Sequence, residues 1–160
     1  MTVLDNSSDN PGVIAFPPLM WLIGATISAL IHFFVIRVPM MSNYHVALVC
    51  GIVLVIIAPT LALSAMLTFR KAGTNVDPAK PALTIARGGP YRFTRNPMYL
   101  ALCLLQVALS FFLNDWITLG FVVPLALLLH FGVILREEKY LTAKFGAPYL
   151  ELKSEVRRWI

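Results

Sequence analysis

Long apolar runs, separated by short polar segments, dominate the chain. Four such runs lie at 19–36, 44–69, 97–113 and 116–135. A helix needs about 20 apolar residues to cross the hydrocarbon core of a bilayer, and these runs are close to that length. The pattern therefore predicts an all-α, polytopic membrane protein with about four transmembrane helices.

The breaks between the runs predict how the helices are connected. Only Asn114 and Asp115 separate the last two runs, so these helices are expected to form an antiparallel helical hairpin. The second run contains no charge and is longer than the hydrocarbon core requires, with Pro59 inside it. A helix of that length must tilt or bend, and Pro59 is the expected position of a kink.

Small residues recur four positions apart in the first run. Gly24 and Ser28 form one such pair, and Ala25 and Ala29 form another. This spacing lets helices approach closely in lipid, either within one chain or between copies of it. A homo-oligomer is therefore left open by the sequence.

Polar segments flank a single membrane domain, expected to comprise residues 17–160. Residues 1–16 form a polar N-terminal segment. Beyond the fourth run, charges alternate with apolar residues four apart, which predicts a cytosolic amphipathic segment at the membrane interface. Gly146 and Pro148 interrupt this segment, and a further short helix is expected within 149–160.

Composition and charge narrow the class of protein. Of the 160 residues, 58% are hydrophobic and 13% are charged, whereas soluble domains are about 45–50% apolar and about 25% charged. All but one of the 13 basic residues lie in two stretches, 70–95 and 136–158. Basic connections favour the cytoplasmic side, which predicts that both chain termini are cytoplasmic, in a bacterial inner membrane or the endoplasmic reticulum. The net charge of +5 is thus explained by topology, and no nucleic-acid partner is expected.

Several familiar signatures of catalysis are missing from the sequence. It has no GxGxxG, no GxxxxGK[ST] and no GxSxG, and so no recognisable nucleotide-binding loop or nucleophile elbow. The three histidines are too scattered to suggest a metal site. Cys50 and Cys103 lie inside apolar runs and are expected to pack as small residues rather than form a disulfide.

Polar residues are expected to gather at the basic face of the membrane. In the predicted hairpin the start of one helix lies beside the end of the other. This brings Arg92, Arg95, Asn96 and Tyr99 next to Glu137 and Glu138. Arginine suits a carboxylate, and glutamate suits an ammonium group or ribose hydroxyls. Such a cluster could hold a zwitterionic cofactor.

Each member of this cluster also has a plainer interpretation. Arg92 and Arg95 are equally typical of basic anchors at a membrane surface. Paired glutamates after a membrane span are often a solvated helix surface. His130 lies seven residues, or two helical turns, before Glu137 and is expected on the same face, although a lone histidine there is more often a packed residue.

Two blocks of sequence carry a family resemblance. The first is Gly89-Pro90-Tyr91-Arg92-x-x-Arg95-Asn96-Pro97-Met98-Tyr99. The second is Glu137-Glu138-x-x-Leu141-x-x-x-Phe145-Gly146-x-x-Tyr149, followed by Val156-x-Arg158. Together they resemble the signature of the integral-membrane methyltransferases, which include isoprenylcysteine carboxyl methyltransferases and phospholipid N-methyltransferases. The resemblance covers about half of the chain, roughly residues 85–160.

Three positions depart from the common family pattern. Many members have Arg-His-Pro where this chain has Asn96 between Arg95 and Pro97, although the asparagine form also occurs. A glycine common two residues after the tyrosine is Ala101, and the second tyrosine of a Tyr-x-x-Tyr pair is Leu152. These departures leave the cofactor cluster intact but weaken the inference that the substrate is an isoprenylcysteine.

The resemblance implies methyl transfer from S-adenosylmethionine to a lipophilic or lipid acceptor that enters from the bilayer. The acceptor classes are an isoprenylcysteine-like carboxylate, a phospholipid amine, and a small thiol or amine. The residues expected to act in catalysis are Arg95, Glu137 and Glu138. The residues expected to bind the cofactor, within 87–99 and 130–160, are Gly89, Tyr91, Arg92, Asn96, Pro97, Tyr99, His130 and Arg136.

Two other classes of function stay open at this point. One is an NADPH-dependent membrane sterol- or enone-reductase-like enzyme, which shares a similar carboxy-terminal architecture but usually presents more polar residues to the cofactor phosphates. The other is a non-enzymatic membrane scaffold or transporter subunit, which leaves the Gly-Pro-Tyr loop and the glutamate pair unexplained.

Overall fold

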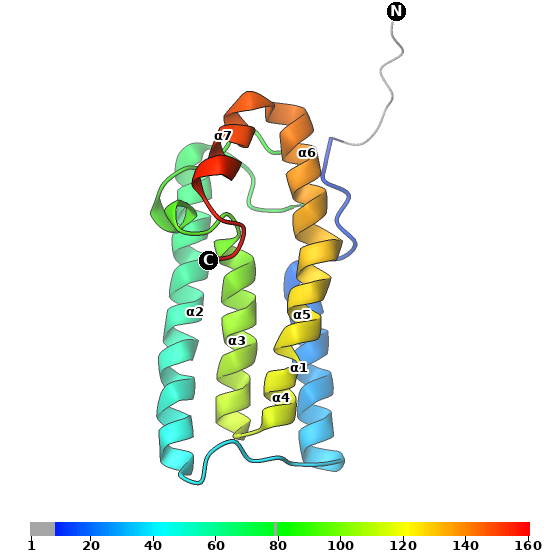
Figure 1. Cartoon of the computed structure of the whole chain (residues 1–160), viewed down its shortest axis with the longest axis vertical. Helices are drawn as coiled ribbons and strands as arrows, with labels where there is room; N and C mark the ends of the chain where they lie inside the picture. The colour runs from blue at the N-terminus through cyan, green and yellow to red at the C-terminus, as the bar shows by residue number, and fades with distance from the viewer. Residues whose placement is uncertain (1–8, 79) are drawn as a thin grey trace, which may run out of the picture.

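The computed structural model describes residues 9–78 and 80–160, and most of that part of the chain is helical. It contains no strand there beyond one isolated bridge between Pro39 and Asp115. Long helices run side by side as a bundle, and the C-terminal helices after residue 135 extend beyond one end of it (Figure 1). The predicted all-α fold class is confirmed. Residues 1–8 of the predicted polar N-terminal segment lie outside the described residues.

Two long helices come first along the chain. α1 (Pro17–Phe34) begins with prolines in its first turn, where a missing N–H costs no helical hydrogen bond. α2 (Tyr44–Ala72) passes through Pro59 and ends where Gly73 adopts a left-handed conformation, with φ +73°. Both helices coincide with the first two predicted runs to within a few residues.

The last two predicted runs form a helical hairpin. α3 (Pro97–Leu113) has the predicted bounds. Asn114, with φ 49°, closes the turn, and Asp115 caps the next helix by accepting the backbone N–H of Thr118. The return limb then consists of four consecutive elements: α4 (Trp116–Gly120), α5 (Val122–Leu129), the π-helix η2 (His130–Ile134) and α6 (Leu135–Phe145).

The π-helix corrects one prediction made from regular helical spacing. The carbonyl of His130 accepts a hydrogen bond from the N–H of Leu135, five residues further on. A π turn contains more residues than an α turn, so it rotates the following residues about the helix axis. His130 and Glu137 are therefore not separated by two regular turns, and the prediction that they share a face was wrong.

α3 is the central helix of the bundle. It contacts α1, α2, α4 and α5, and its most extensive contact is with α2. The buried residues of α2 are all small: Ala47, Gly51, Ala58 and Ala65. A Cβ at Gly51 would lie 3.2 Å from the ring of Phe112 on α3, which shows how closely the two helices approach. Small residues permit such packing in lipid.

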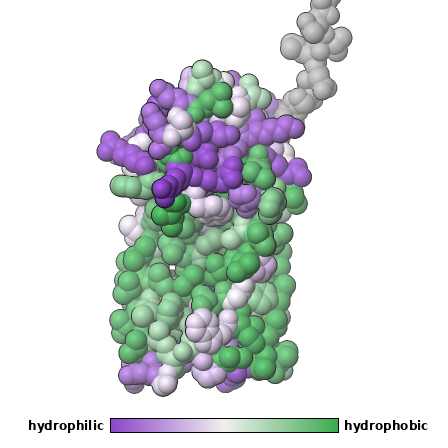
Figure 2. Space-filling model, in the orientation of Figure 1, coloured by the Kyte–Doolittle hydropathy of each residue, from purple (hydrophilic) through white to green (hydrophobic). Residues whose placement is uncertain are grey.

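An apolar belt covers most of the length of the bundle. Figure 2 shows it between a broad polar end and a narrow polar rim. Among the described residues, three helices are long and apolar enough to cross a membrane: Pro17–Phe34, Tyr44–Ala72 and the combined Trp116–Phe145. In α2 only 17% of the most apolar window is buried within the chain, so the remainder needs lipid around it. α3, with 17 residues, is shorter, and its assignment as a fourth span stays a prediction.

The broad polar end is called the polar cap below. It consists of residues 73–78 and 80–96, α6, α7 (Ala147–Glu155) and the C-terminal tail, residues 156–160. α7 folds back over the bundle, and the tail returns to lie beside the start of α3 (Figure 1). α7 begins two residues earlier than the short helix predicted within 149–160.

Candidate active site

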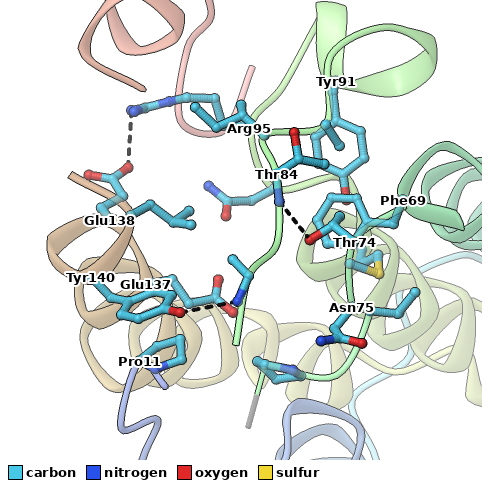
Figure 3. Close-up of a pocket in the computed structure, with 18 of the residues that line it drawn as sticks. Pro11, Phe69, Thr74, Asn75, Thr84, Tyr91, Arg95, Glu137, Glu138 and Tyr140 are labelled. Carbon is cyan, nitrogen blue, oxygen red and sulfur yellow. Dashed lines mark hydrogen bonds and ion pairs between the residues drawn. The ribbon is translucent and has the colours of Figure 1, made fainter. Parts of the chain in front are cut away.

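A cavity lies in the polar cap, where α3 begins and the fourth helical limb leaves the bundle. Six segments that are far apart in the sequence line it: Pro11; Phe69; 74–78, Lys80, Ala82 and 84–86; Tyr91 and 95–99; Glu137, Glu138, Tyr140 and Leu141; and Tyr149 and Leu152. Figure 3 shows the side chains of α6 on one side of the cavity, with Phe69, Thr74 and Tyr91 on the other.

The Gly-Pro-Tyr loop folds as the short helix η1 (Gly89–Arg92) and supplies an aromatic wall. Gly89 has φ +51°, and a Cβ there would lie 2.7 Å from the hydroxyl oxygen of Thr68 on α2. Tyr91 stacks on Phe69, with 5.0 Å between ring centroids. Its buried hydroxyl has no hydrogen-bond partner among the described residues. Burial raises the pKa of Tyr91, so the hydroxyl stays protonated and able to donate.

Glu138 is buried and surrounded by basic side chains. Arg158 binds both of its oxygens, with Nε to Oε1 and Nη2 to Oε2 each at 2.8 Å. Nη2 of Arg95 lies 3.0 Å from Oε1, and Nζ of Lys153 lies 3.8 Å from Oε2. Three cations therefore surround one carboxylate, which leaves an excess of positive charge at this wall of the cavity.

Only one nitrogen of the Arg95 guanidinium contacts Glu138. The side chain is 9% exposed, and its Nη2 makes the ion pair. Its Nε and Nη1 are buried without a hydrogen-bond partner among the described residues. Buried donors are nearly always satisfied in folded proteins, so these two atoms are available to a ligand in the cavity.

The C-terminal tail fixes the start of α3. The backbone N–H of Arg95 donates to the carbonyl of Arg157 over 3.0 Å. The carbonyl of Arg158 accepts from the side chains of Asn96, at 2.9 Å, and Thr94, at 3.1 Å. These hydrogen bonds hold the tail and the Arg-Asn-Pro turn together as one unit.

Glu137 differs sharply from its neighbour Glu138. The hydroxyl of Tyr99 donates to its Oε1 over 2.6 Å. Among the described residues no ion pair involves Glu137, and this hydrogen bond is the sole one that its carboxylate accepts. One oxygen of a partly buried carboxylate is therefore left for a donor or a cation from outside the chain.

Tyr140 joins the N-terminal segment to the loop that closes the cavity. Its hydroxyl donates to Asp9 over 2.7 Å and accepts the backbone N–H of Ala82 at 3.1 Å. Nζ of Lys144 approaches the same hydroxyl at 2.9 Å and also pairs with Asp9. Pro11 thereby reaches the cavity wall.

Eleven residues were predicted to form the site, and the structure brings most of them together. Those that line the cavity are Tyr91, Arg95, Asn96, Pro97, Tyr99, Glu137 and Glu138. Those that lie outside its lining are Gly89, Arg92, His130 and Arg136. Gly89 shapes the η1 turn rather than facing the cavity.

The other three outlying residues point elsewhere. Arg92 is exposed on the surface of the polar cap. His130 accepts a hydrogen bond from Trp159 over 3.4 Å and stacks near its ring. Arg136 donates to the carbonyl of Gly12 over 2.9 Å, so it binds the N-terminal segment. Their predicted contact with a cofactor stays a prediction without support from this geometry.

Sequence reasoning did not assign a role to several residues of the cavity. Tyr149, which lines the cavity, and Arg158, which binds Glu138 from outside the lining, belong to the second family-like block, and this was the signal that could have identified them. Burial raises the pKa of Tyr149 to about 12. The lining residues 74–78, Lys80, Ala82 and 84–86 belong to no motif, and their place in the wall depends on how the loop folds. Tyr140, on α6, belongs to no motif either.

The cavity combines three chemical features. Aromatic rings and the Glu137 carboxylate attract cations, whereas the free atoms of Arg95 suit a carboxylate. The set fits a ligand that carries charges of both signs. Within the described part of the chain, no group of three or more histidine, cysteine, aspartate or glutamate side chains is arranged to hold a metal ion.

Two comparisons with known proteins found matches to parts of this chain. A protein of Haemophilus influenzae (strain ATCC 51907 / DSM 11121 / KW20 / Rd), named "Uncharacterized protein", is 38% identical over 63 residues, which are 39% of this chain and 100% of that protein. The sequence profile of the phospholipid methyltransferase family matches residues 46–148, more than half of the chain. The matched region contains α3, the Arg-Asn-Pro turn and both glutamates. This chain therefore belongs to the phospholipid methyltransferase family.

Proposed function

We propose that this protein transfers a methyl group from S-adenosylmethionine to a lipophilic acceptor at the membrane face that carries the polar cap. The family match supports methyl transfer in general. The chemistry of the cavity supports the choice of cofactor, and its position at the edge of the apolar belt supports a lipophilic acceptor.

The buried guanidinium of Arg95 is the observation that carries the proposal. Leaving Nε and Nη1 buried without acceptors is costly unless a ligand supplies them. The carboxylate of S-adenosylmethionine would do so. The hydroxyl of Tyr91, which has no partner in the described part of the chain, would bind another polar group of the same molecule. The polar atoms of Arg95 and Tyr91 therefore fit the polar groups of the cofactor.

The positive groups of the cofactor also find suitable surroundings. An ammonium and a sulfonium are stabilised by carboxylates and by the faces of aromatic rings. Tyr91, Tyr99 and Tyr149 supply rings around the cavity, and Glu137 supplies a negative charge that forms no ion pair among the described residues. The rings suit the sulfonium, and the carboxylate of Glu137 is kept for the acceptor.

The chain's own residues have mainly to align the reactants. When bound, S-adenosylmethionine supplies an electrophilic methyl group, and alignment of the acceptor with it accounts for much of the rate of such transfers. Glu137, held by Tyr99, is placed to take the proton that an amine or thiol must lose, or to balance a cationic acceptor. A carboxylate acceptor would meet repulsion from Glu137, so this feature favours an amine.

Glu138 is assigned a different role from Glu137. Its charge is already matched by Arg95 and Arg158, so it is poorly suited to accept a proton. Its contact with Nη2 of Arg95 instead fixes that side chain in the cavity wall. We therefore assign Glu138 to positioning Arg95 and Glu137 to the acceptor.

Transfer of label is the experiment that tests the proposal. The full chain, purified into lipid nanodiscs, is incubated with S-adenosylmethionine carrying a labelled methyl group and a total lipid extract. Label is expected in the lipid fraction, and Glu137→Gln is expected to abolish most of it. Failure of wild-type protein to transfer label to any lipid would overturn the proposal, as would stabilisation by NADPH in place of S-adenosylmethionine.

A further inference from the structure

The three cations around Glu138 do not share it equally. Arg158 forms a two-point contact, with both of its distances at 2.8 Å. Arg95 reaches a single oxygen through Nη2 at 3.0 Å, and Lys153 remains at 3.8 Å. Two-point arginine–carboxylate pairs are the strong form of this interaction, so Arg158 is the principal partner of Glu138.

The position of Arg158 is fixed independently of this ion pair. Its carbonyl accepts hydrogen bonds from Asn96 and Thr94, and the preceding carbonyl accepts the N–H of Arg95. The tail that carries Arg158 is thus attached to the same turn that carries Arg95. Glu138, on α6, lies between the two guanidinium groups.

Without Arg158, both oxygens of Glu138 would be open to a two-point contact with Arg95. A carboxylate can accept two parallel hydrogen bonds from one guanidinium, and Glu138 lies within reach of Arg95. Arg158 occupies that two-point position and leaves Nε and Nη1 of Arg95 unused. Those two atoms are the ones that the proposed function assigns to the carboxylate of the cofactor.

We infer that Arg158 is a positioning residue: by occupying both oxygens of Glu138, it keeps Arg95 free to bind the carboxylate of the ligand. This inference rests on the proposed function. It also gives the C-terminal tail a role in ligand binding without direct contact, since Arg158 is not part of the cavity lining.

The test compares two ligands that differ in the amino-acid group, which contains the carboxylate. S-adenosylhomocysteine carries the amino-acid group, and 5′-methylthioadenosine lacks it. Arg158→Gln is expected to weaken S-adenosylhomocysteine about tenfold or more, which is the scale of a lost charge-assisted hydrogen bond, and to leave 5′-methylthioadenosine within about twofold. Calorimetry on the full chain in nanodiscs measures both affinities.

Arg157→Gln is the matched control. It removes the same charge from the neighbouring residue. The side chain of Arg157 is exposed and lies outside the cavity lining, and the contact of this residue with Arg95 is made by its backbone carbonyl. Both ligands are expected to bind this variant within about twofold of wild type, because exposed charges contribute little. Equal losses in Arg157→Gln and Arg158→Gln would overturn the inference, since they would indicate a general effect of charge.

A double-variant cycle separates an indirect role from direct contact. If Arg158 acts through Arg95, then adding Arg158→Gln to Arg95→Gln costs no further affinity for S-adenosylhomocysteine. Additive losses, or equal losses for both ligands, would overturn the inference. Should Arg158→Gln fail to fold, Arg158→Lys is tested in the same way; lysine cannot form the two-point contact, so a smaller but still carboxylate-selective loss is expected.

The same measurements distinguish a failure of the proposed function from a failure of the inference about Arg158. Wild-type protein that binds neither ligand would overturn the proposed function and this inference with it. Wild-type protein that binds S-adenosylhomocysteine, with no selective effect of Arg158→Gln or Arg158→Lys, would overturn the inference alone.

Discussion

Tyr99 and Glu137 join α3 to α6 through a 2.6 Å hydrogen bond at the wall of the cavity. The tyrosine belongs to the first family-like block and the glutamate to the second, so this contact connects the two. It also orients the one glutamate of the pair that has no cation beside it among the described residues.

Glu137→Gln is expected to reduce methyl transfer about 100-fold, at the lower end of general acid–base contributions. The amide keeps the size of the side chain but cannot take a proton. Tyr99→Phe should reduce transfer less, because the carboxylate remains and only its orientation is lost. Rates from labelled S-adenosylmethionine under single-turnover conditions check both. If Glu137→Gln transferred methyl groups at the wild-type rate, Glu137 would have no role in the reaction.

Gly89→Ala is expected to disturb the site without touching a ligand. The new Cβ would have to adopt φ +51° and would lie 2.7 Å from the hydroxyl of Thr68. The left-handed conformation alone costs about 1–2 kcal/mol. Thr68→Ala in the same chain should recover part of the melting temperature, since it removes the clash but not the strain. Gly120→Ala is the control, because no atom lies within 4 Å of a Cβ there and the φ is ordinary. No difference between the two glycine variants would contradict this account.

Tyr140→Phe is expected to loosen the N-terminal segment and residues 82–84. The substitution removes the hydroxyl that links Asp9, Ala82 and Lys144 but keeps the ring. Amide hydrogen exchange should accelerate in 10–14 and 82–84, because protection depends on local opening. Tyr44→Phe, at the opposite end of the bundle, makes the same chemical change as a control. Unchanged exchange in Tyr140→Phe would show that the hydroxyl does not hold these segments.

Asp115→Ala is expected to destabilise the fold without changing cofactor affinity. Asp115 accepts the N–H of Val38 at 2.8 Å and both the N–H and hydroxyl of Thr118 at 2.9 Å, at the end of the bundle opposite the cavity. Loss of a helix N-cap costs about 0.5–2 kcal/mol, and the unpaired N–H of Val38 adds to this. The loss of stability is measured by thermal unfolding, with the reaction of the buried Cys103 thiol with a labelling reagent as the signal. Glu155→Ala, on an exposed position, should not shift the transition.

Much of the fold could be predicted because lipid imposes a simple rule on the sequence. Every spanning segment must be apolar and helical, so α3 has the predicted bounds and α2 begins at the predicted residue. The two-residue break at Asn114 and Asp115 was enough to predict the hairpin. The hairpin in turn explains why Arg95, Tyr99 and the glutamate pair meet.

The features that escaped prediction depend on contacts rather than on local pattern. The π-helix leaves no mark in the hydrophobic pattern, and it separated His130 from Glu137. The return of the C-terminal tail, which brings Arg158 to Glu138, is a long-range contact in a short polar segment. Hydropathy also could not show that Glu138 is surrounded by three cations while Glu137 forms no ion pair within the described residues.

Titration with S-adenosylmethionine tests the central claim most directly. Calorimetry on the full chain is expected to show saturable binding to wild type, at least tenfold weaker binding to Arg95→Gln, and wild-type binding to Arg92→Gln, whose side chain is exposed and lies outside the cavity lining. Absence of saturable binding to wild type, or equal losses in the two arginine variants, would contradict the assignment of this cavity as the cofactor site.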